Sequence, residues 1–525
     1  MFDKEVLIKA KEKAVLFIEN THKAEDIQKE ILSKILQENV NTWIGRKYNF
    51  SNIKSYEDFR GALPLTVFSD YDSSIARILG EEKAVLYASE NYQFVSSSGT
   101  TNNPKIIPMS MDYAKQVFIP FYITYFGQLV THFPDFLKNA SKTVNFKLDP
   151  NRALTKLKNG ANHKGLSQIN FGDDFKESVL FEPGSGTKWT DIPTEVEEDL
   201  ERMYYRIRVS SEYEINALVG INPAVIHILK FLLKVWADRL INDIRNGTLN
   251  GEDFNTPNPA LAERLSSLYS KSKELLPIDL WPDLRYVICW KEGVSQFYLK
   301  ESRKVFGEKV KLMSAPLGSS EAPVAIPLFD EEDQNLLVYD TVFYEFIDVL
   351  NDQNVVLLGD LQLDRSYAVV VTQQSGFYRY ITGDLVTVKG FVNGVPTVEY
   401  AGRYSPEKFI SDDVFLAAIK EINGLFDIGI VNFTFQCPAE KDQNITLLIE
   451  LEDEIHQELI RKIEKNIDDF LMKKSDRYCE LRQNHGMSSV RIEVAERNAF
   501  FRNWISEVEK GKRPPQVKDK ISEFI

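Results

Sequence analysis

The sequence predicts an α/β protein with a large N-terminal unit and a small α+β C-terminal unit. Residues 283–316 predict a strand, a helix and a second strand, which favours a parallel βαβ arrangement. Residues 338–400 are rich in strand-like segments separated by turns. After Arg403, strands alternate with amphipathic helices over about the length of one small domain. We therefore expect two domains, 1–403 and 404–525.

The N-terminal unit is expected to begin with helical structure. Apolar side chains recur at helical spacing between residues 24 and 40, so this segment is predicted to form an amphipathic helix. The residues on its apolar face are Ile27, Ile31, Leu32, Ile35, Leu36 and Val40. Short apolar runs and turns alternate in residues 50–95, which indicates mixed α and β structure, and residues 110–270 are mostly helical by pattern.

The clearest strand signals come later in the chain. Residues 283–290 are short, apolar and aromatic, as expected of a buried strand. Residues 385–403 predict a hairpin, because Asn393-Gly394 stands at its centre. The elements expected beyond Arg403 are strands at 432–440, 445–453 and 489–496 and helices at 454–474 and 500–511.

Composition limits the classes of function. The 525 residues are 43% hydrophobic and 27% charged, an ordinary soluble globular composition, and the net charge of −14 argues against a nucleic-acid partner. The three cysteines, Cys289, Cys437 and Cys479, are scattered and odd in number, which favours a reducing, cytoplasmic compartment. The histidines have no zinc-ligand spacing. We also expect no membrane partner, because the N-terminus lacks a signal-peptide core and lysines interrupt the most apolar helix, 222–241.

The most informative motif is a loop of small polar residues between two strand-like runs, within residues 92–108. A loop that holds phosphate needs inward-pointing backbone N–H groups, hydroxyl donors and a residue without Cβ where the ligand approaches. The residues that meet these needs are Ser97, Ser98, Gly99, Thr100 and Thr101, and Lys105 adds a positive charge. The Walker A pattern is absent. From this stretch alone, a phosphate-binding loop and a polar surface hairpin both stay open.

Two further motifs place carboxylates beside strand ends. Glu321 follows Ser319 and Ser320 after a predicted strand, where a carboxylate could hold Mg²⁺ that carries nucleotide phosphates. Gly383-Asp384 stands between two strands, and a carboxylate there could accept both hydroxyls of a ribose. Taken singly, each motif is also explained by an ordinary turn.

These motifs form an ordered set along the chain. The Ser/Gly/Thr loop is followed by the Ser-Ser-Glu motif, by Gly383-Asp384 and by Arg403. The set resembles the adenylate-forming superfamily, and more closely the bacterial type of the auxin-responsive (Gretchen Hagen) family of acyl-acid amido synthetases. Segments outside the motifs resemble the same family, among them residues 27–71, 280–299 and 375–403.

The resemblance implies a fold and a reaction. The fold would be a large adenylate-forming domain, with mixed sheets, helices and a distorted barrel, followed by a small C-terminal lid domain. The reaction would be ATP-dependent adenylation of a carboxylic acid, followed by transfer of the acyl group to an amine, typically that of an amino acid. The implied cofactors are ATP and Mg²⁺, and the implied partners are these small-molecule substrates.

The resemblance also implies roles for single residues. Ser97 to Thr101 and Lys105 would hold phosphate, Ser319 and Ser320 would contact the adenylate, and Glu321 would ligate Mg²⁺. Asp384 would hold the ribose hydroxyls, Arg403 would meet the nucleotide, and Gly293 would lie near the adenine and the acyl pocket. Lys518, or else Lys512, would be the C-terminal catalytic lysine; a solvated basic tail is the alternative.

The sequence departs from the family pattern at three places, Asn102-Asn103, Ala322 and Asp412-Asp413. Two alternatives stay open beside an amido synthetase: an acyl-CoA ligase, and a non-catalytic relative that binds a nucleotide or an acyl group. Asn102-Asn103 and Asp412-Asp413 favour the second of these. Pyrophosphate release distinguishes an enzyme from a binder.

Overall fold

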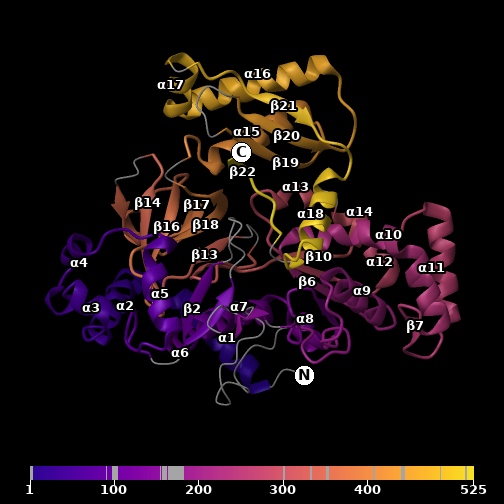
Figure 1. Cartoon of the computed structure of the whole chain (residues 1–525), viewed down its shortest axis with the longest axis horizontal. Coiled ribbons are helices and arrows are strands. Elements are labelled where there is room, and N and C mark those ends of the chain that lie inside the picture. The colour runs from indigo at the N-terminus through magenta and orange to yellow at the C-terminus, as the bar shows by residue number, and fades with distance from the viewer. Residues whose placement is uncertain are drawn as a thin grey trace.

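The structure is a computed structural model of the chain. It describes residues 4–89, 92–96, 105–153, 155–156, 162–163, 183–299, 302–330, 334–350, 354–405, 408–438, 444–484, 486–514 and 517–524. Figure 1 shows the indigo N-terminal helices at one end, the strand-rich middle beside them and the C-terminal sheet on top. No helix within these described ranges has the length and apolar character needed to cross a bilayer.

The described residues form helices and strands throughout. The helices are α1 (Lys4–Glu19), α2 (Ala24–Glu38), α3 (Trp43–Lys47), α4 (Tyr56–Ala62), α5 (Asp72–Leu79), α6 (Met111–Tyr113), α7 (Ile119–His132), α8 (Pro134–Lys138), α9 (Asp199–Ser210), α10 (Pro223–Asn246), α11 (Pro259–Ser272), α12 (Pro277–Leu280), α13 (Ser295–Leu299), α14 (Ser302–Phe306), α15 (Asp412–Phe426), α16 (Gln457–Lys474), α17 (Asp476–Asn484) and α18 (Ala499–Glu509). The strands are β1 (Tyr92–Ser96), β2 (Ile106–Ser110), β3 (Thr143–Asn145), β4 (Thr155–Lys156), β5 (Asn162–His163), β6 (Ala217–Ile221), β7 (Thr248–Leu249), β8 (Glu252–Asp253), β9 (Tyr286–Cys289), β10 (Lys311–Ser314), β11 (Leu317–Gly318), β12 (Pro323–Pro327), β13 (Asn335–Leu337), β14 (Phe343–Asp348), β15 (Val355–Val356), β16 (Ser366–Thr372), β17 (Tyr380–Val392), β18 (Val395–Arg403), β19 (Ile430–Cys437), β20 (Thr446–Leu451), β21 (Arg491–Val494) and β22 (Ser522–Phe524).

A parallel four-stranded sheet lies at the centre of the N-terminal unit, in the order β10-β9-β6-β3. The predicted βαβ unit is confirmed, because β9 and β10 pair in parallel with helices between them. The mostly helical prediction for 110–270 was wrong at β3 and β6. The five residues of β6 are a short apolar run, which periodicity cannot distinguish from a helix. Gly220 lets β6 pack closely on α10, since a Cβ there would lie 2.3 Å from Ile226 Cγ1.

An antiparallel eight-stranded sheet follows, in the order β11-β12-β13-β18-β17-β16-β14-β15. The predicted hairpin is confirmed: Val392 pairs with Val395 across Asn393 and Gly394. Both turn residues have positive φ, 48° and 91°, as a type I′ turn requires. The N-terminal helices pack on this sheet, and the predicted amphipathic helix is α2, which buries Leu32, among others, in the same core.

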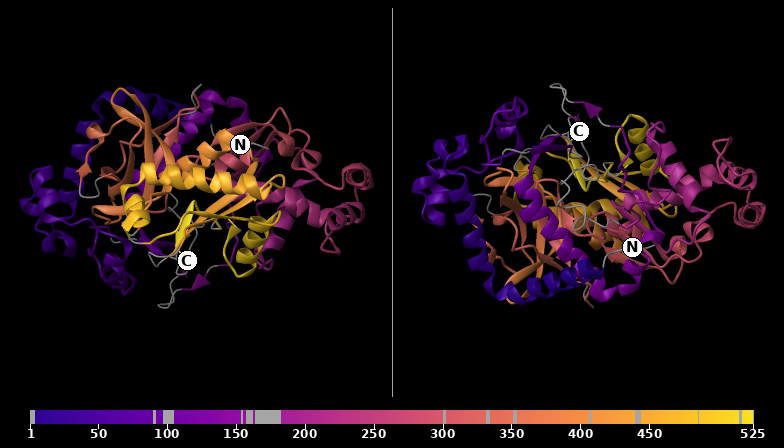
Figure 2. Two further views of the ribbon diagram at one scale, coloured as in Figure 1. Left: turned by 90° about the horizontal axis from the view of Figure 1, so that it is seen from above. Right: turned by 90° about the horizontal axis from the view of Figure 1, so that it is seen from below.

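The residues after β18 build a second, smaller sheet, in the order β21-β20-β19-β22. Its core is formed with α15, α16 and α17. The sequence predicts α16 among these helices, but it did not indicate α15 or α17. Viewed from above, its helices and strands lie across the middle of the N-terminal unit (Figure 2). Helix α18 departs from this arrangement, because Trp504 and Val508 are buried in the core around α9 and α10 of the N-terminal unit. The chain therefore leaves the small sheet, docks on the large unit and returns as β22.

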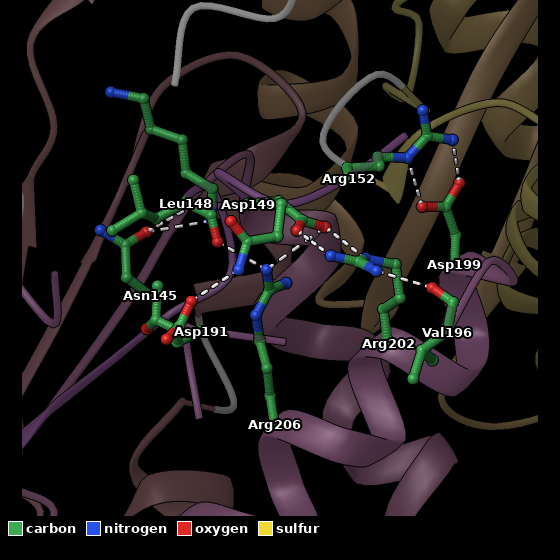
Figure 3. Close-up of polar contacts among 12 residues, drawn as sticks. Asn145, Leu148, Asp149, Arg152, Asp191, Val196, Asp199, Arg202 and Arg206 are labelled. Atoms are coloured by element: carbon green, nitrogen blue, oxygen red, sulfur yellow. Dashed lines mark hydrogen bonds and ion pairs between the residues drawn. The ribbon is translucent and has the colours of Figure 1, made fainter. Parts of the chain in front are cut away.

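A buried network of ion pairs holds the loop after β3 to α9 (Figure 3). Arg202 donates to both carboxylate oxygens of Asp149, at 2.9 and 2.5 Å. Arg206 donates to Leu148 O at 2.5 Å, and Arg152 forms a two-bond pair with Asp199. The network fixes the helix against which α18 packs.

Candidate active site

The candidate site lies where the parallel sheet, the eight-stranded sheet and the C-terminal unit meet. Parallel strands present their carboxyl ends at one edge, which is where ligands bind in open α/β sheets. Trp290 follows β9 at this edge, and its Nε1 donates to Pro316 O at 3.1 Å, just beyond β10. Two neighbouring strand ends are thereby joined beneath the site.

The two strands that flank the predicted phosphate loop are present. β1 and β2 pair in antiparallel fashion from Tyr92 with Ser110 to Ser96 with Ile106. The predicted phosphate-binding residues Ser97, Ser98, Gly99, Thr100 and Thr101 lie outside the described residues, as does Asn102-Asn103. The structure therefore confirms only the two strands that flank the loop.

Lys105, Glu321 and Tyr380 meet at the foot of this loop. Lys105 Nζ lies 3.5 Å from Glu321 Oε1 and donates to Tyr380 Oη at 3.1 Å. The hydroxyl of Tyr380 in turn donates to Glu321 Oε1 at 3.3 Å. Glu321 is only 5% exposed, so its carboxylate depends on these partners for compensation. Burial, together with the charge of Glu321, raises the pKa of Tyr380, which keeps this hydroxyl protonated as a donor.

Sequence reasoning did not single out Tyr380. It stands four residues before Asp384, where the sequence predicts a break between two strands, but the structure places both residues in one strand, β17. Its contact with Glu321 joins two motifs that are 59 residues apart in the sequence.

The two serines before Glu321 lie in one turn. Ser319 Oγ accepts from the backbone N–H groups of Glu321 and Ala322, both at 3.3 Å, and Ser319 N donates to Ala322 O at 2.8 Å. Ser319 therefore shapes the turn that presents Glu321. Ser320 is half-buried in the same turn. The departure at Ala322 fits, because its methyl group is fully buried.

Asp384 and Arg403 face each other across the pair of strands β17 and β18. Arg403 Nη1 donates to Asp384 Oδ1 at 2.5 Å, and Nη2 donates to Thr382 O at 3.1 Å. Gly383 leaves room for the guanidinium: its φ is +80°, and a Cβ would lie 2.7 Å from Arg403 Nη2. Burial alone would lower the pKa of Arg403, but the charges around it, Asp384 first, raise the pKa overall.

Gly293 lies in the loop after β9, against Tyr400 of β18. Its φ is +64°, and a Cβ there would lie 3.4 Å from the Tyr400 ring. The neighbouring Glu292 fixes the loop, because its carboxylate accepts from Tyr400 N and from the amide of Asn335. Burial raises the pKa of Glu292 to about 7. Gly293 therefore lies against β18, the strand that pairs with the strand carrying Asp384.

The two candidate lysines of the C-terminal region occupy different places. Lys518 Nζ lies 4.7 Å from the centre of the Trp290 ring. The residue as a whole remains exposed, but protein around the ammonium lowers its pKa, and Asp384 and Glu321 partly offset this effect. Lys512 instead pairs with Glu507 at the end of α18. Lys518 is thus the lysine that shares an electrostatic environment with the predicted nucleotide residues.

Asp412, one of the departures from the family pattern, ties the junction between the two units. Its carboxylate accepts from Arg403 N at 2.8 Å, from Lys408 Nζ at 2.7 Å and from Ser522 Oγ at 2.5 Å. A Cβ at Gly402 would lie 2.3 Å from Asp412 Cβ. Asp412 therefore links the last residues of β18 to the strand that follows Lys518.

Five charged groups gather at this junction: the cations Lys105, Arg403 and Lys518 and the carboxylates Glu321 and Asp384. They come from five separate segments of the chain. A magnesium-bound nucleotide requires cations that stabilise its phosphate oxygens. It also requires one or two carboxylates, which bind the magnesium ion and the ribose hydroxyls.

Known sequence families match most of the chain. Residues 15–312 match the GH3 family N-terminal domain, residues 335–403 the GH3 family central domain and residues 413–522 the GH3 family C-terminal domain. The predicted phosphate loop, Gly293, Asp384, Arg403 and Lys518 fall within these three segments, whereas the Ser-Ser-Glu motif at 319–321 lies between the first and the second.

Individual relatives agree with the family match. The jasmonoyl-L-amino acid synthetase JAR4 of Nicotiana attenuata is 25% identical over 92% of this chain and 88% of its own. The indole-3-acetic acid-amido synthetase GH3.4 of Arabidopsis thaliana is 23% identical over 74% of this chain and 69% of its own. The solved structure of the AtGH3.15 acyl acid amido synthetase in complex with 2,4-DB has the same fold, with a TM-score of 0.80, 21% identity and coverage of 100% of this chain and 95% of that one. The chain therefore belongs to the GH3 family.

Proposed function

We propose that this protein joins a small carboxylic acid to an amine, typically that of an amino acid, in a two-step reaction that consumes ATP. The observation that carries the proposal is the convergence of Lys105 with Glu321, of Arg403 with Asp384, and of Lys518, on one junction. The names of the relatives support the substrate classes, since one describes a jasmonoyl-L-amino acid synthetase and the other an indole-3-acetic acid-amido synthetase.

In the first step, a carboxylate oxygen of the acid attacks the α-phosphorus of ATP. The bond from that phosphorus to the bridging oxygen breaks, and pyrophosphate leaves with the electron pair. Negative charge on the phosphate oxygens would be stabilised by Lys105 and Lys518, together with the loop that contains Ser97 to Thr101. Asp384 would bind the ribose hydroxyls and Arg403 would hold Asp384 in place, while Gly293 leaves space for the adenine beside Tyr400.

Mg²⁺ fits this set of residues. It is commonly held by one or two carboxylates and by the phosphates of its substrate, rather than by a cage of protein ligands. Within the described residues, no group of three or more His, Cys, Asp or Glu could hold a metal alone. Glu321, buried beside Lys105, is the carboxylate we assign to the ion. When bound, the ion would neutralise phosphate charge.

In the second step, the amine nitrogen attacks the acyl carbon, the bond from that carbon to the AMP oxygen breaks, and the nitrogen loses a proton as the amide forms. We propose that the C-terminal unit, residues 404–525, reorients between the steps as a lid, with Lys408 and Asp412 at its junction. The three cysteines are free, and we propose a cytoplasmic location on the grounds of their reduced state.

The test is pyrophosphate release from Mg·ATP, with hydroxylamine as a surrogate acceptor, over a panel of aryl, indolyl and fatty acids. We expect a signal for one class of acid and none for Asp384→Ala. Two results together would exclude a simple ATPase. Pyrophosphate release would stop when no nucleophile is present, and amides would form when amino acids are added. Binding of ATP without release of pyrophosphate in the presence of any of the acids would contradict the proposal and leave the non-catalytic alternative. Formation of an acyl thioester with coenzyme A, together with no amide formation from any amine, would identify an acyl-CoA ligase instead.

A further inference from the structure

The segment that carries Lys518, residues 517–521 (here the lysine segment), is held by both units of the protein. Val517 packs against the core around α9 and α10 of the N-terminal unit. Four residues later, Ile521 is buried in the core of the C-terminal unit, and its carbonyl accepts from Phe435 N at 2.9 Å. Lys518 therefore lies at the point where the chain passes from one core to the other.

On the N-terminal side, the lysine segment is held by Asn222. Asn222 Nδ2 donates to Val517 O at 2.7 Å. The other end of the same amide caps α10, because Oδ1 accepts from Ala224 N at 3.1 Å. Asn222 is only 4% exposed, so both of its polar atoms need these partners.

Asn222 and Trp290 occupy equivalent places on two adjacent strands. Ile221 of β6 pairs with Cys289 of β9, so the residues that follow them lie side by side at the carboxyl edge of the parallel sheet. Asn222 contacts Val517 and Trp290 contacts Lys518, so two neighbouring residues of the lysine segment are held by two neighbouring strand ends. The two contacts together fix the positions of the backbone beside Lys518 and of the Lys518 side chain.

We infer that Asn222 is a positioning residue for the first half-reaction: it docks the lysine segment so that Lys518 reaches the nucleotide. The inference rests on the proposed function. It adds a contact, from Asn222 to Val517, that we expect the protein to make in only one of the two positions of the lid. A lysine side chain is long and flexible, so the place of its ammonium depends on where the backbone is held. We expect the bond from Asn222 to Val517 to break when the C-terminal unit reorients for amide formation. The second half-reaction therefore does not need it.

Two substitutions at Asn222 test the inference without removing the helix cap. Asn222→Asp keeps the capping oxygen but places a carboxylate oxygen against Val517 O in place of the donor. Asn222→Ser also caps helices well, but its shorter side chain does not reach Val517. We expect either change to slow pyrophosphate release about tenfold in kcat, with KM for ATP unchanged. The acid is the one that gives the strongest signal in the panel above.

The second half-reaction supplies the contrast. The chemically prepared adenylate of the same acid is mixed with hydroxylamine and each variant, and hydroxamate formation is expected to proceed at the rate of the unmodified protein. Asn258→Asp is the matched control. Asn258 likewise precedes a proline and caps a helix, with Oδ1 accepting from Leu261 N at 3.1 Å, but it is remote from the lysine segment in the sequence and makes no contact with it among the described residues. We expect both of its rates to be unchanged.

A double-mutant cycle distinguishes positioning from a general loss of structure. If Asn222 acts through Lys518, then Asn222→Asp in a Lys518→Ala background will slow pyrophosphate release no further. Equal slowing of both half-reactions, an additive effect in the double variant, or no effect in either single variant would overturn the inference while leaving the proposed function intact. Absence of pyrophosphate release in the unmodified protein would instead contradict the proposed function.

Discussion

At the scale of single residues, the pair formed by Asp384 and Arg403 gives the clearest prediction. Asp384 is 7% exposed and has its carboxylate fixed by the guanidinium. Replacing it with alanine removes the proposed acceptor of the ribose hydroxyls and leaves Arg403 without its partner. We expect Asp384→Ala to weaken ATP binding by about 1 to 3 kcal/mol, measured by calorimetric titration, with the chain still folded.

The control for this substitution is Asp469→Ala, on the exposed face of α16. It should leave ATP affinity unchanged. An Asp384→Ala variant that keeps full ATP affinity would rule out the assignment of the ribose to Asp384.

Glu292 predicts a pH dependence of stability. Its pKa in the folded protein is about 7, raised by burial from an ordinary value of 4.5. Between these two values, the folded protein binds more protons at this site than the unfolded chain does, so the contribution of Glu292 to the free energy of unfolding falls as pH rises. We expect the stability of Glu292→Gln, relative to the unmodified protein, to rise by about 3 kcal/mol between pH 4.5 and pH 8.

The measurement is urea unfolding of both proteins at each pH. Glu458→Gln, at an exposed position at the start of α16, serves as the control and should show no such trend. A constant difference between Glu292→Gln and the unmodified protein over this range would contradict the raised pKa.

At the scale of elements, helix α18 is the informative case, because it belongs to the C-terminal sequence but packs on the N-terminal unit. Trp504 is 4% exposed, and its buried Nε1 has no hydrogen-bond partner among the described residues. We expect Trp504→Ala to destabilise the protein by about 3 to 5 kcal/mol, since it leaves a large cavity. Trp504→Phe should cost much less, because it keeps most of the ring and removes an unsatisfied donor.

Urea unfolding of the two variants measures both values. Equal losses for alanine and phenylalanine would mean that the indole nitrogen has a partner after all. Losses near zero for both would mean that α18 does not dock on the N-terminal unit in solution.

At the scale of the whole molecule, the site exists only where the two units meet. A chain that ends at residue 405 keeps Lys105, Glu321, Asp384 and Arg403 but loses Lys518 and the support of Asp412. We expect such a chain to lose turnover while it still binds ATP, and to be less stable because α18 no longer covers the core around α9. Assays of amide formation, ATP titration and urea unfolding separate the three effects.

Trp504→Ala in the full chain is the control for stability, because it should reproduce part of the destabilisation without removing the lysine. Full amide synthesis by the shortened chain would refute a role for the C-terminal unit as a lid.

The sequence by itself determined the class of fold and most of its elements. Local signals were sufficient for the hairpin at Asn393-Gly394, for α16 and for the strands β19 to β21, because turn chemistry and side-chain periodicity act over only a few residues. The family followed from the order of its motifs, and the sequence matches agree with it. The short buried strands β3 and β6 were missed, since β6 is an apolar run of five residues that carries no period and β3 is only three residues long, Thr143 to Asn145.

Only the tertiary structure decided which residues meet. Nothing local indicates that Tyr380 contacts Glu321, that α18 crosses to the other unit, or that Asn222 contacts Val517. Each of these contacts joins segments that are 59 to about 300 residues apart, and it depends on how sheets and helices pack rather than on the conformation of either segment. The sequence could therefore name the charged residues of the site, but the packing of two units was needed to bring them to one place.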